Sequence, residues 1–136
     1  MQAFAAGQVA SRLADLASRV QAAVKESDAD AVHDLRVSIR RLGQSLDVFG
    51  ALLPKSEAKK VRKTLSRLMA IAGQIRDRDI ALEFLAEAGL SRDDQLWKRL
   101  KAGRKAADKD FVRRVKRWSQ GQFADKWRSS LRLDGR

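Results

Sequence analysis

Basic side chains recur at helical spacing in two neighbouring stretches of the chain, and their chemistry suits the binding of an anion. The first stretch holds His33, Arg36, Arg40 and Gln44. In the second stretch Arg62 and Arg76 are the basic residues, and Ser66 and Gly73 share their helical stripe. At about 100° per residue, each set falls on one stripe of a helix. Because guanidinium groups donate paired hydrogen bonds to phosphate oxygens, two such stripes that face each other predict a groove for a phosphate-bearing anion.

The elements that would hold the two stripes are helices that fold back on each other. Apolar residues in steps of three and four mark the first helix, at Val32, Leu35, Ile39, Leu42, Leu46, Phe49 and Leu53. The second helix has Val61, Leu65, Leu68, Ala72 and Ile75, and is expected to continue through Ile80, Phe84 and Leu85. A turn at Pro54-Lys55-Ser56 separates them, and folding back about Lys55 sets three pairs level: His33 with Asp77, Arg36 with Gln74, and Arg40 with Ala70.

The same stepping predicts helices in the rest of the chain. A first helix carries Ala6, Val9, Leu13, Leu16, Val20 and Ala23. A fourth, from Ser91 to about Ser119, carries Leu96, Leu100, Ala107, Phe111, Val115 and Trp118. A break at Gln120-Gly121-Gln122 precedes a short last helix with Phe123, Trp127 and Leu131. Expected boundary signals are Asp28 and Asp30 at the second helix, Gly89 at the end of the third, and Ser91 with Asp94 at the fourth. The prediction is an all-α, up-and-down antiparallel bundle of about four long helices, with residues 1–136 as a single domain.

Composition further limits the kinds of site and partner that the chain can have. The 136 residues include 29 lysines and arginines against 17 aspartates and glutamates, a net charge of +12, with no cysteine and a single histidine. Disulfides, thiol nucleophiles and thiolate metal sites are excluded, and one histidine argues against a metal or other cofactor. No apolar run approaches the ~20 residues of a membrane span, and Arg12 and Asp15 interrupt the start where a secretion signal would be apolar. An anionic partner is expected, and no membrane.

A purely structural reading of the basic stripes remains open. Flanking arginines on helical bundles are often solvated or paired with carboxylates on the next helix. Asp77 and Asp79 are available to hold Arg36 or Arg40, and Asp47 is expected level with Lys63. Against this reading, cations outnumber the nearby carboxylates, and convergent charge that is left uncompensated favours an anionic ligand.

Two segments resemble the markers of a known family, the conserved histidine α-helical (CHAD) domain. AVHDLRVSIRRLGQSLDVF is similar to its signature helix, through His33, Arg36, Arg40, Arg41 and Leu42. AGQIRDRDIALEFL is similar to its second marker, through Gly73, Arg76, Asp77, Asp79 and Ile80. The resemblance extends over about Gln8 to Leu131. It departs from the family pattern at Gly43 and Asp47, where further basic residues are common.

The resemblance implies non-catalytic binding of inorganic polyphosphate through a basic groove. Carried over by position, the ligand-binding residues are His33, Arg36, Arg40 and Arg76, with Arg41 and Arg62 as further candidates. Asp77 and Asp79 would orient these cations. The resemblance also implies a cytoplasmic protein, found in some relatives at polyphosphate granules.

The family usually consists of two related bundle halves, and this chain resembles the first. That leaves open a natural short form, a piece of a longer protein, or a protomer of a homodimer. An aromatic C-terminal segment motivates the homodimer, through Trp118, Phe123, Trp127 and Leu131.

Three other functions stay open. The charge suits nucleic acid, although no recognition-helix motif or RNA-binding aromatic signature is present. A helical assembly module would use an exposed apolar edge. An enzyme acting on phosphate esters would need clustered carboxylates for metal ions or a glycine-rich phosphate loop, and the sequence has no such loop.

Overall fold

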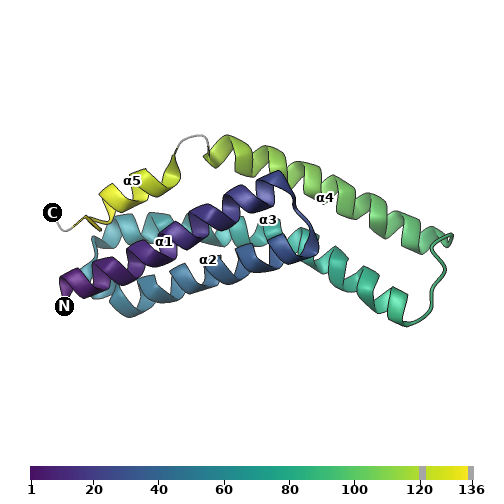
Figure 1. Cartoon of the computed structure of the whole chain (residues 1–136), viewed down its shortest axis with the longest axis horizontal. Helices are drawn as coiled ribbons and strands as arrows, with labels where there is room; N and C mark the ends of the chain where they lie inside the picture. Colours follow the sequence, from purple (N-terminus) through teal and green to yellow (C-terminus); the bar gives the residue numbers. More distant parts are fainter. Residues whose placement is uncertain (120–121, 135–136) are drawn as a thin grey trace.

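The fold consists of helices joined by short connections (Figure 1). The computed structural model describes residues 1–119 and 122–134, and within these ranges it contains no β-strand. The elements are α1 (Gln2–Lys25), α2 (Ala29–Phe49), the 3-10 turn η1 (Gly50–Leu52), α3 (Lys55–Glu87), α4 (Gln95–Ser119) and α5 (Phe123–Ser130). The predicted all-α bundle of four long helices and a short last one is therefore confirmed. The predicted break at Gln120-Gly121 lies outside the described residues.

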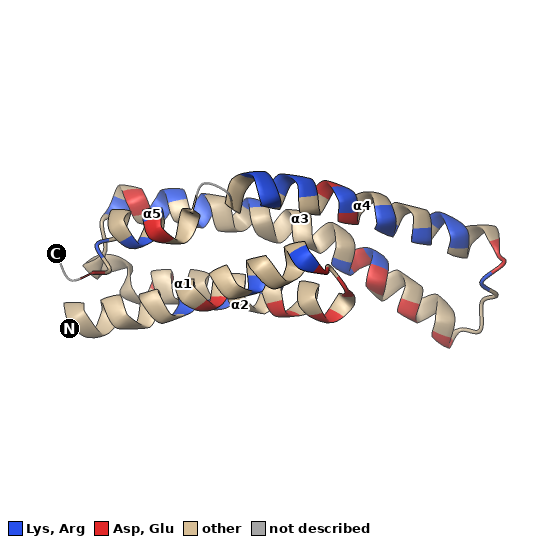
Figure 2. Cartoon of the chain, turned by 45° about the horizontal axis from the view of Figure 1, so that its top comes forward, with Lys and Arg blue, Asp and Glu red and all other residues tan. Residues whose placement is uncertain are grey.

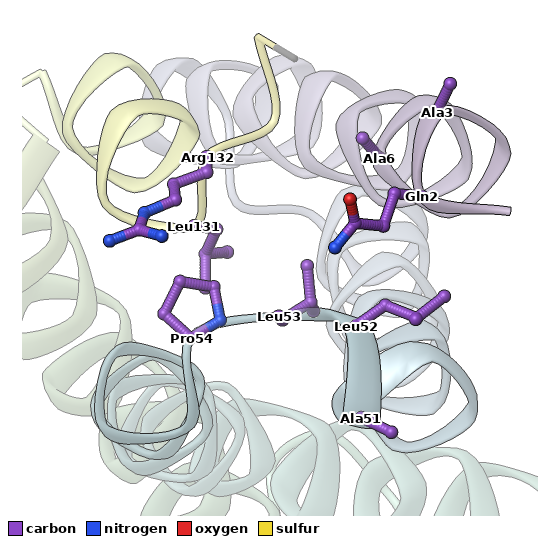
Figure 3. Close-up of a pocket in the computed structure, with 9 residues that line it drawn as sticks. All are labelled: Gln2, Ala3, Ala6, Ala51, Leu52, Leu53, Pro54, Leu131 and Arg132. Atoms are coloured by element: carbon purple, nitrogen blue, oxygen red, sulfur yellow. The ribbon is translucent and has the colours of Figure 1, made fainter. Parts of the chain in front are cut away.

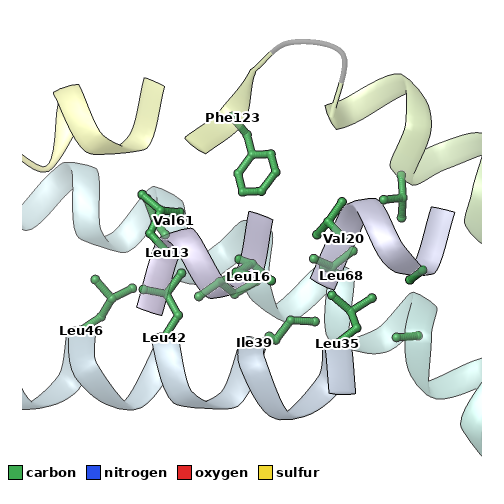
Figure 4. Packing of buried hydrophobic residues seen from close by; sticks show 14 of the residues in the cluster. Leu13, Leu16, Val20, Leu35, Ile39, Leu42, Leu46, Val61, Leu68 and Phe123 are labelled. Carbon is green, nitrogen blue, oxygen red and sulfur yellow. The ribbon is translucent and has the colours of Figure 1, made fainter. Parts of the chain in front are cut away.

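The core follows the steps of three and four in the sequence (Figure 4). α1 contributes Val9, Leu13, Leu16, Val20 and Ala23, all buried. They face the buried stripe of α2, made up of Val32, Leu35, Ile39, Leu42 and Leu46. Buried residues of α3, α4 and α5 complete the cluster. Each buried leucine or valine contributes roughly 1.5–3 kcal/mol relative to exposure, so these stripes hold the helices together.

Local signals fix where the helices begin and end. The Asp28 carboxylate accepts from the Ala31 amide at 2.8 Å and caps α2. Gly89 has φ +83° just after α3, and the next amide, that of Leu90, donates back to the Leu85 carbonyl at 3.0 Å.

The predicted start of α4 at Ser91 is wrong, because the Ser91 hydroxyl caps a separate turn by accepting from the Asp93 amide at 3.1 Å. α4 begins at Gln95, and the carboxylate of Asp94 accepts from the Leu96 amide at 2.8 Å. Asp94 is thus the capping residue of the helix, and Ser91 belongs to the turn before it.

The end of α3 and the start of α4 form an arm that projects past the α1–α2 connection (Figure 1). We call residues 80–101 the α3–α4 arm. At its base the two helices approach closely, since a Cβ at Gly103 would lie 3.0 Å from Nε of Arg78. At its tip the Arg92 guanidinium lies 4.8 Å from the centroid of the buried Trp97 ring.

In the α3–α4 arm, the buried residues of α3 differ from those expected from the sequence. Ile80 and Phe84 are 47% and 68% exposed, whereas Asp79 and Leu82 are buried. The step from Ile75 to Ile80 is five residues, so Ile80 leaves the buried stripe, and the three-four pattern continues through Asp79 and Leu82 instead. Leu96, expected in the core of α4, is also 47% exposed.

The C-terminal segment folds back so that α5 packs against α1. Its aromatic rings pack within the chain: Phe123 stacks on Trp118 with centroids 4.1 Å apart, and Trp127 lies 5.1 Å from Phe123. Phe123 and Leu131 are buried. The aromatic segment that motivated a homodimer thus packs largely against its own chain, and the homodimer itself stays a prediction. Both termini lie at the same end of the bundle (Figure 1).

Candidate anion-binding site

The line along which α2 and α3 pack, here the α2–α3 seam, carries most of the predicted site. Arg62 of α3 sets its register, because its guanidinium donates to the Leu46 carbonyl at 2.8 Å and lies 2.9 Å from the Asp47 carboxylate. The sequence placed Asp47 level with Lys63, and the contact of Asp47 with the neighbouring Arg62 agrees with this register to within about one residue. Counting from this contact in antiparallel helices, Arg36 is level with Gly73, and His33 with Arg76.

The helix period places Arg36 and Arg40 on the α3 side of α2. Asp47 lies eleven residues from Arg36 and seven from Arg40, so all three fall within about 20–40° of one another around the helix. Since Asp47 contacts α3 through Arg62, the flank with Arg36 and Arg40 faces α3. Arg62 and Arg76, fourteen residues apart, share the matching flank of α3. The structure thus brings five predicted site residues to one seam: His33, Arg36, Arg40, Arg62 and Arg76.

Arg41 lies apart from this set. It is seven residues from Asp34 and therefore shares its flank of α2. Asp34 pairs with Arg19 of α1 at 3.4 Å, so this flank faces α1. Arg41 is exposed on the opposite side of α2 from the α2–α3 seam.

The seam cations differ in how far they are neutralised. Arg76 lies 4.0 Å from Glu83 on its own helix, and Arg62 pairs with Asp47. Within residues 1–119 and 122–134, Arg36 and Arg40 form no ion pair within 4.0 Å. Arg36 is half-buried, and its Nε is fully buried with no acceptor in hydrogen-bond reach among the described atoms. Arg40 and His33 are exposed.

Two glycines leave open space on the flanks that meet at the seam. A Cβ at Gly43 of α2 or at Gly73 of α3 would have no neighbouring heavy atom within 4 Å. By this count Gly73 lies level with Arg36 to within about one residue, and it presents no side chain to this part of the seam. The replacement of a basic residue by Gly43, noted as a departure from the family pattern, also opens the seam.

The two aspartates of the second marker have separate environments. Asp79 is buried and does not reach the seam arginines; it accepts from Arg104 Nε of α4 at 3.0 Å. The Arg104 guanidinium also donates to the Ser27 carbonyl at 2.6 Å, and the Ser27 hydroxyl donates to Asp108. Asp77 is exposed and has no ion pair in the described part of the chain. Asp79 therefore orients Arg104, a residue that the sequence reasoning missed.

A cavity of about 630 Å³ lies elsewhere, at the end of the bundle where the termini meet (Figure 3). Alanine, leucine and proline side chains make up most of its lining, with Gln2 and Arg132 as the polar members. Because a single cation faces it, this cavity lacks the convergent charge of the α2–α3 seam, and we do not assign it to anion binding.

The described residues hold neither a clustered set of metal ligands nor a membrane-spanning helix. No group of three or more histidine, cysteine, aspartate or glutamate residues is placed to hold a metal ion in residues 1–119 and 122–134. Over the same ranges, no helix combines the length and the apolar character needed to cross a bilayer.

Comparison with known proteins gives one match. No curated protein and no solved structure shows a significant match to the chain. Residues 7–135, nearly the whole length, match the CHAD domain. Both sequence markers fall inside this range, on the two helices that form the seam. The chain therefore belongs to the CHAD domain family.

Proposed function

We propose that this CHAD domain binds inorganic polyphosphate along the α2–α3 seam and does not turn it over. CHAD domains are linked in general to polyphosphate binding and are generally binding modules without catalysis. The seam carries cations from Arg76, at the level of His33, to the level of Asp47, a length of about 21 Å at 1.5 Å per residue. A linear polyanion that follows this line would meet Arg36 and Arg40 in succession.

The observation that carries the proposal is the buried, unpartnered Nε of Arg36. Buried donors in folded proteins almost always have an acceptor, and an unsatisfied one costs free energy. A guanidinium can only donate, so its missing partner must be an acceptor. Phosphate oxygens are charged acceptors; because the Nε itself is buried, contact with a phosphate requires the Arg36 side chain to turn toward open space at the seam, such as that at Gly73.

The seam residues have unequal roles in this proposal. Arg36 and Arg40 are the primary contacts, because neither has a carboxylate partner in the described chain. Arg62 and Arg76 already face Asp47 and Glu83, so a phosphate must compete with these carboxylates. Arg41 faces the other side of α2 and would contribute through long-range attraction alone.

Catalysis is not part of the proposal, because three carboxylates near the seam have arginine partners and Asp77 stands alone among the described residues. Metal-assisted phosphoryl chemistry needs carboxylates that are free to bind cations. Asp79, Asp47 and Glu83 each face an arginine instead. We further propose that the protein acts in the cytoplasm at polyphosphate granules, as the family resemblance implies.

The test is polyphosphate affinity for single variants at one fixed salt concentration. A charge-assisted hydrogen bond contributes roughly 1.5–3 kcal/mol, so Arg36→Ala and Arg40→Ala should each weaken binding about tenfold or more. Arg36→Lys should lie between, since it keeps the charge and loses the paired donors. Arg12→Ala is the matched control, because Arg12 is an exposed arginine of α1. It removes the same charge and should cost far less.

Competition decides between polyphosphate and nucleic acid, which the net charge of +12 also suits. Polyphosphate immobilised on a surface is challenged with DNA, RNA and short phosphates. Preference for polyphosphate that rises with its chain length supports the proposal. Equal losses for Arg36→Ala and Arg12→Ala, or stronger competition by DNA, would refute it. Release of orthophosphate in proportion to protein would refute the non-catalytic part.

A further inference from the structure

The strongest concentration of charge in the molecule lies on α4, away from the seam. α4 has ten lysines and arginines against two aspartates, a net charge of +8 out of the +12 of the whole chain. Figure 2 shows lysines and arginines along nearly the full length of this helix. No residue of α4 belongs to either family marker.

Most of these cations are exposed and unpaired in the described part of the chain. Arg104 pairs with Asp79, and Arg113 and Arg114 share Asp110. The remaining seven are exposed and have no ion pair within 4.0 Å among the described residues. We call them the α4 ridge: Lys98, Arg99, Lys101, Lys105, Lys109, Lys116 and Arg117. Four of them, Lys98, Lys105, Lys109 and Lys116, fall within about 40° of each other on a line ~27 Å long.

The α4 ridge and the α2–α3 seam lie on different sides of α3. α3 packs against α2 along one flank and against α4 along another. The buried face of α4 carries Phe111 and Val115, and the ridge lies on the solvent face opposite them. A helix is about 10 Å across with its side chains, and the Debye length at physiological salt is ~8 Å. An anion at the seam therefore leaves most of the ridge charge available to another anion.

The chemistry of the α4 ridge favours a linear polyphosphate over single-stranded nucleic acid or a membrane, and duplex DNA is separated by the experiment below. Base stacking needs exposed aromatic rings. The aromatic residues of α4 are Trp97 and Phe111, which are buried, and Trp118, which packs on Phe123. Insertion into a bilayer needs an apolar face, and the apolar face of α4 is used in the bundle. What remains is a row of cations that matches a row of phosphates.

We propose that the α4 ridge is a second polyphosphate site, so that one copy of this protein holds two stretches of polyphosphate and cross-links long chains. The inference rests on the proposed function for its first site. Linking two weak contacts through one long polymer raises overall avidity far above either affinity. The expected activity is therefore to gather polyphosphate into assemblies, in addition to binding it.

The experiment compares three forms of the full chain with short and long polyphosphate. The ridge variant is Lys98→Gln/Lys105→Gln/Lys109→Gln/Lys116→Gln, which keeps helix propensity because glutamine and lysine are similar helix formers. The charge-matched control is Lys25→Gln/Lys59→Gln/Lys63→Gln/Lys126→Gln, at exposed lysines of α1, α3 and α5. Circular dichroism establishes that all forms fold.

Short polyphosphate, no longer than the seam, reports how many sites one copy has. Calorimetry should find two bound chains per copy of the wild type and of the control, and one per copy of the ridge variant. With long polyphosphate, light scattering should show large assemblies for the wild type and the control. The ridge variant, left with one site per copy, should form no such assemblies at the protein concentrations that suffice for the wild type.

Three results would overturn the proposal: one short chain per wild-type copy, equal loss of assembly in the ridge and control variants, or normal polyphosphate assembly by a ridge variant that has lost duplex DNA binding. Failure of the α2–α3 seam as a site can be distinguished from failure of the α4 ridge. Arg36→Ala/Arg40→Ala should remove one of the two short chains and leave the ridge chain bound. If it removes neither, the seam proposal fails while the α4 ridge is judged on its own variant.

Discussion

At the scale of single residues, the α2–α3 seam combines arginines with carboxylate partners and arginines without them. Spacing alone predicted that His33, Arg36, Arg40 and Arg76 share one surface, because a fixed helical period decides which flank a residue occupies. Arg41 became a candidate ligand-binding residue only through its place in the family marker, and the helical period assigns it to the side of α2 that faces α1. The buried Nε of Arg36 was not predictable, since it depends on how side chains pack around that residue in three dimensions.

His33 provides the first prediction at this scale. It is exposed and so has no packing role that a substitution would disturb. His33→Gln should change the free energy of unfolding by less than about 0.5 kcal/mol, as surface substitutions usually do, while weakening polyphosphate binding. Urea denaturation and an affinity measurement on the same preparation test both parts. A large loss of stability with unchanged affinity would make His33 a structural residue.

Asp110 provides a prediction about pH. The hydrogen bond from Arg113 at 2.7 Å lowers the pKa of Asp110 below its ordinary value of 3.8; burial works against this, and the charge of Arg114 adds to it. A lowered native pKa means that the unfolded chain binds the proton more readily. The contribution to stability is therefore present above the ordinary pKa and disappears as pH falls through the native one. NMR titration of the carboxyl should show the low midpoint, and Arg113→Gln should raise it. An unchanged midpoint would contradict the assignment.

At the scale of the helices, Arg104 joins three elements that are distant in sequence. It contacts Asp79 of α3 and the Ser27 carbonyl between α1 and α2, while Asp108 of the same helix accepts from Ser27. Asp79 occupies the position that the three-four pattern assigns to the core, so its burial could have been read from the sequence. Its partner could not, because the pairing depends on how α4 returns along α3 after the arm.

The Asp79–Arg104 ion pair gives a prediction about stability. Removing one partner of a buried ion pair leaves an uncompensated charge, so Arg104→Met should cost about 3 kcal/mol of unfolding free energy. The double variant Asp79→Leu/Arg104→Met should regain most of this loss, since neither charge remains. Arg62→Met is the control, because its partner Asp47 is 70% exposed and such pairs contribute under ~1 kcal/mol. A double variant as unstable as the sum of its singles would show that the pair is not coupled.

At the scale of the whole molecule, the bundle and the arm should differ in local stability. The bundle is held by one continuous buried cluster, whereas α3 and α4 support each other in the arm. Amides of residues 82–100 should therefore exchange with deuterium faster than those of Leu13–Val20. Hydrogen exchange followed by mass spectrometry measures this difference. Equal protection in both regions would mean that the arm unfolds only with the bundle.

The meeting of both termini at one end of the bundle has a practical consequence. Gln2 and Arg132 line the same cavity, so the chain enters and leaves the fold at nearly the same place. A protein with this layout can be spliced into a surface loop of a host protein without stretching either one. The α3–α4 arm, at the opposite end of the molecule, would then point away from the host (Figure 1). With one fluorophore on each side of it, the inserted domain would report its own folding state within the host protein.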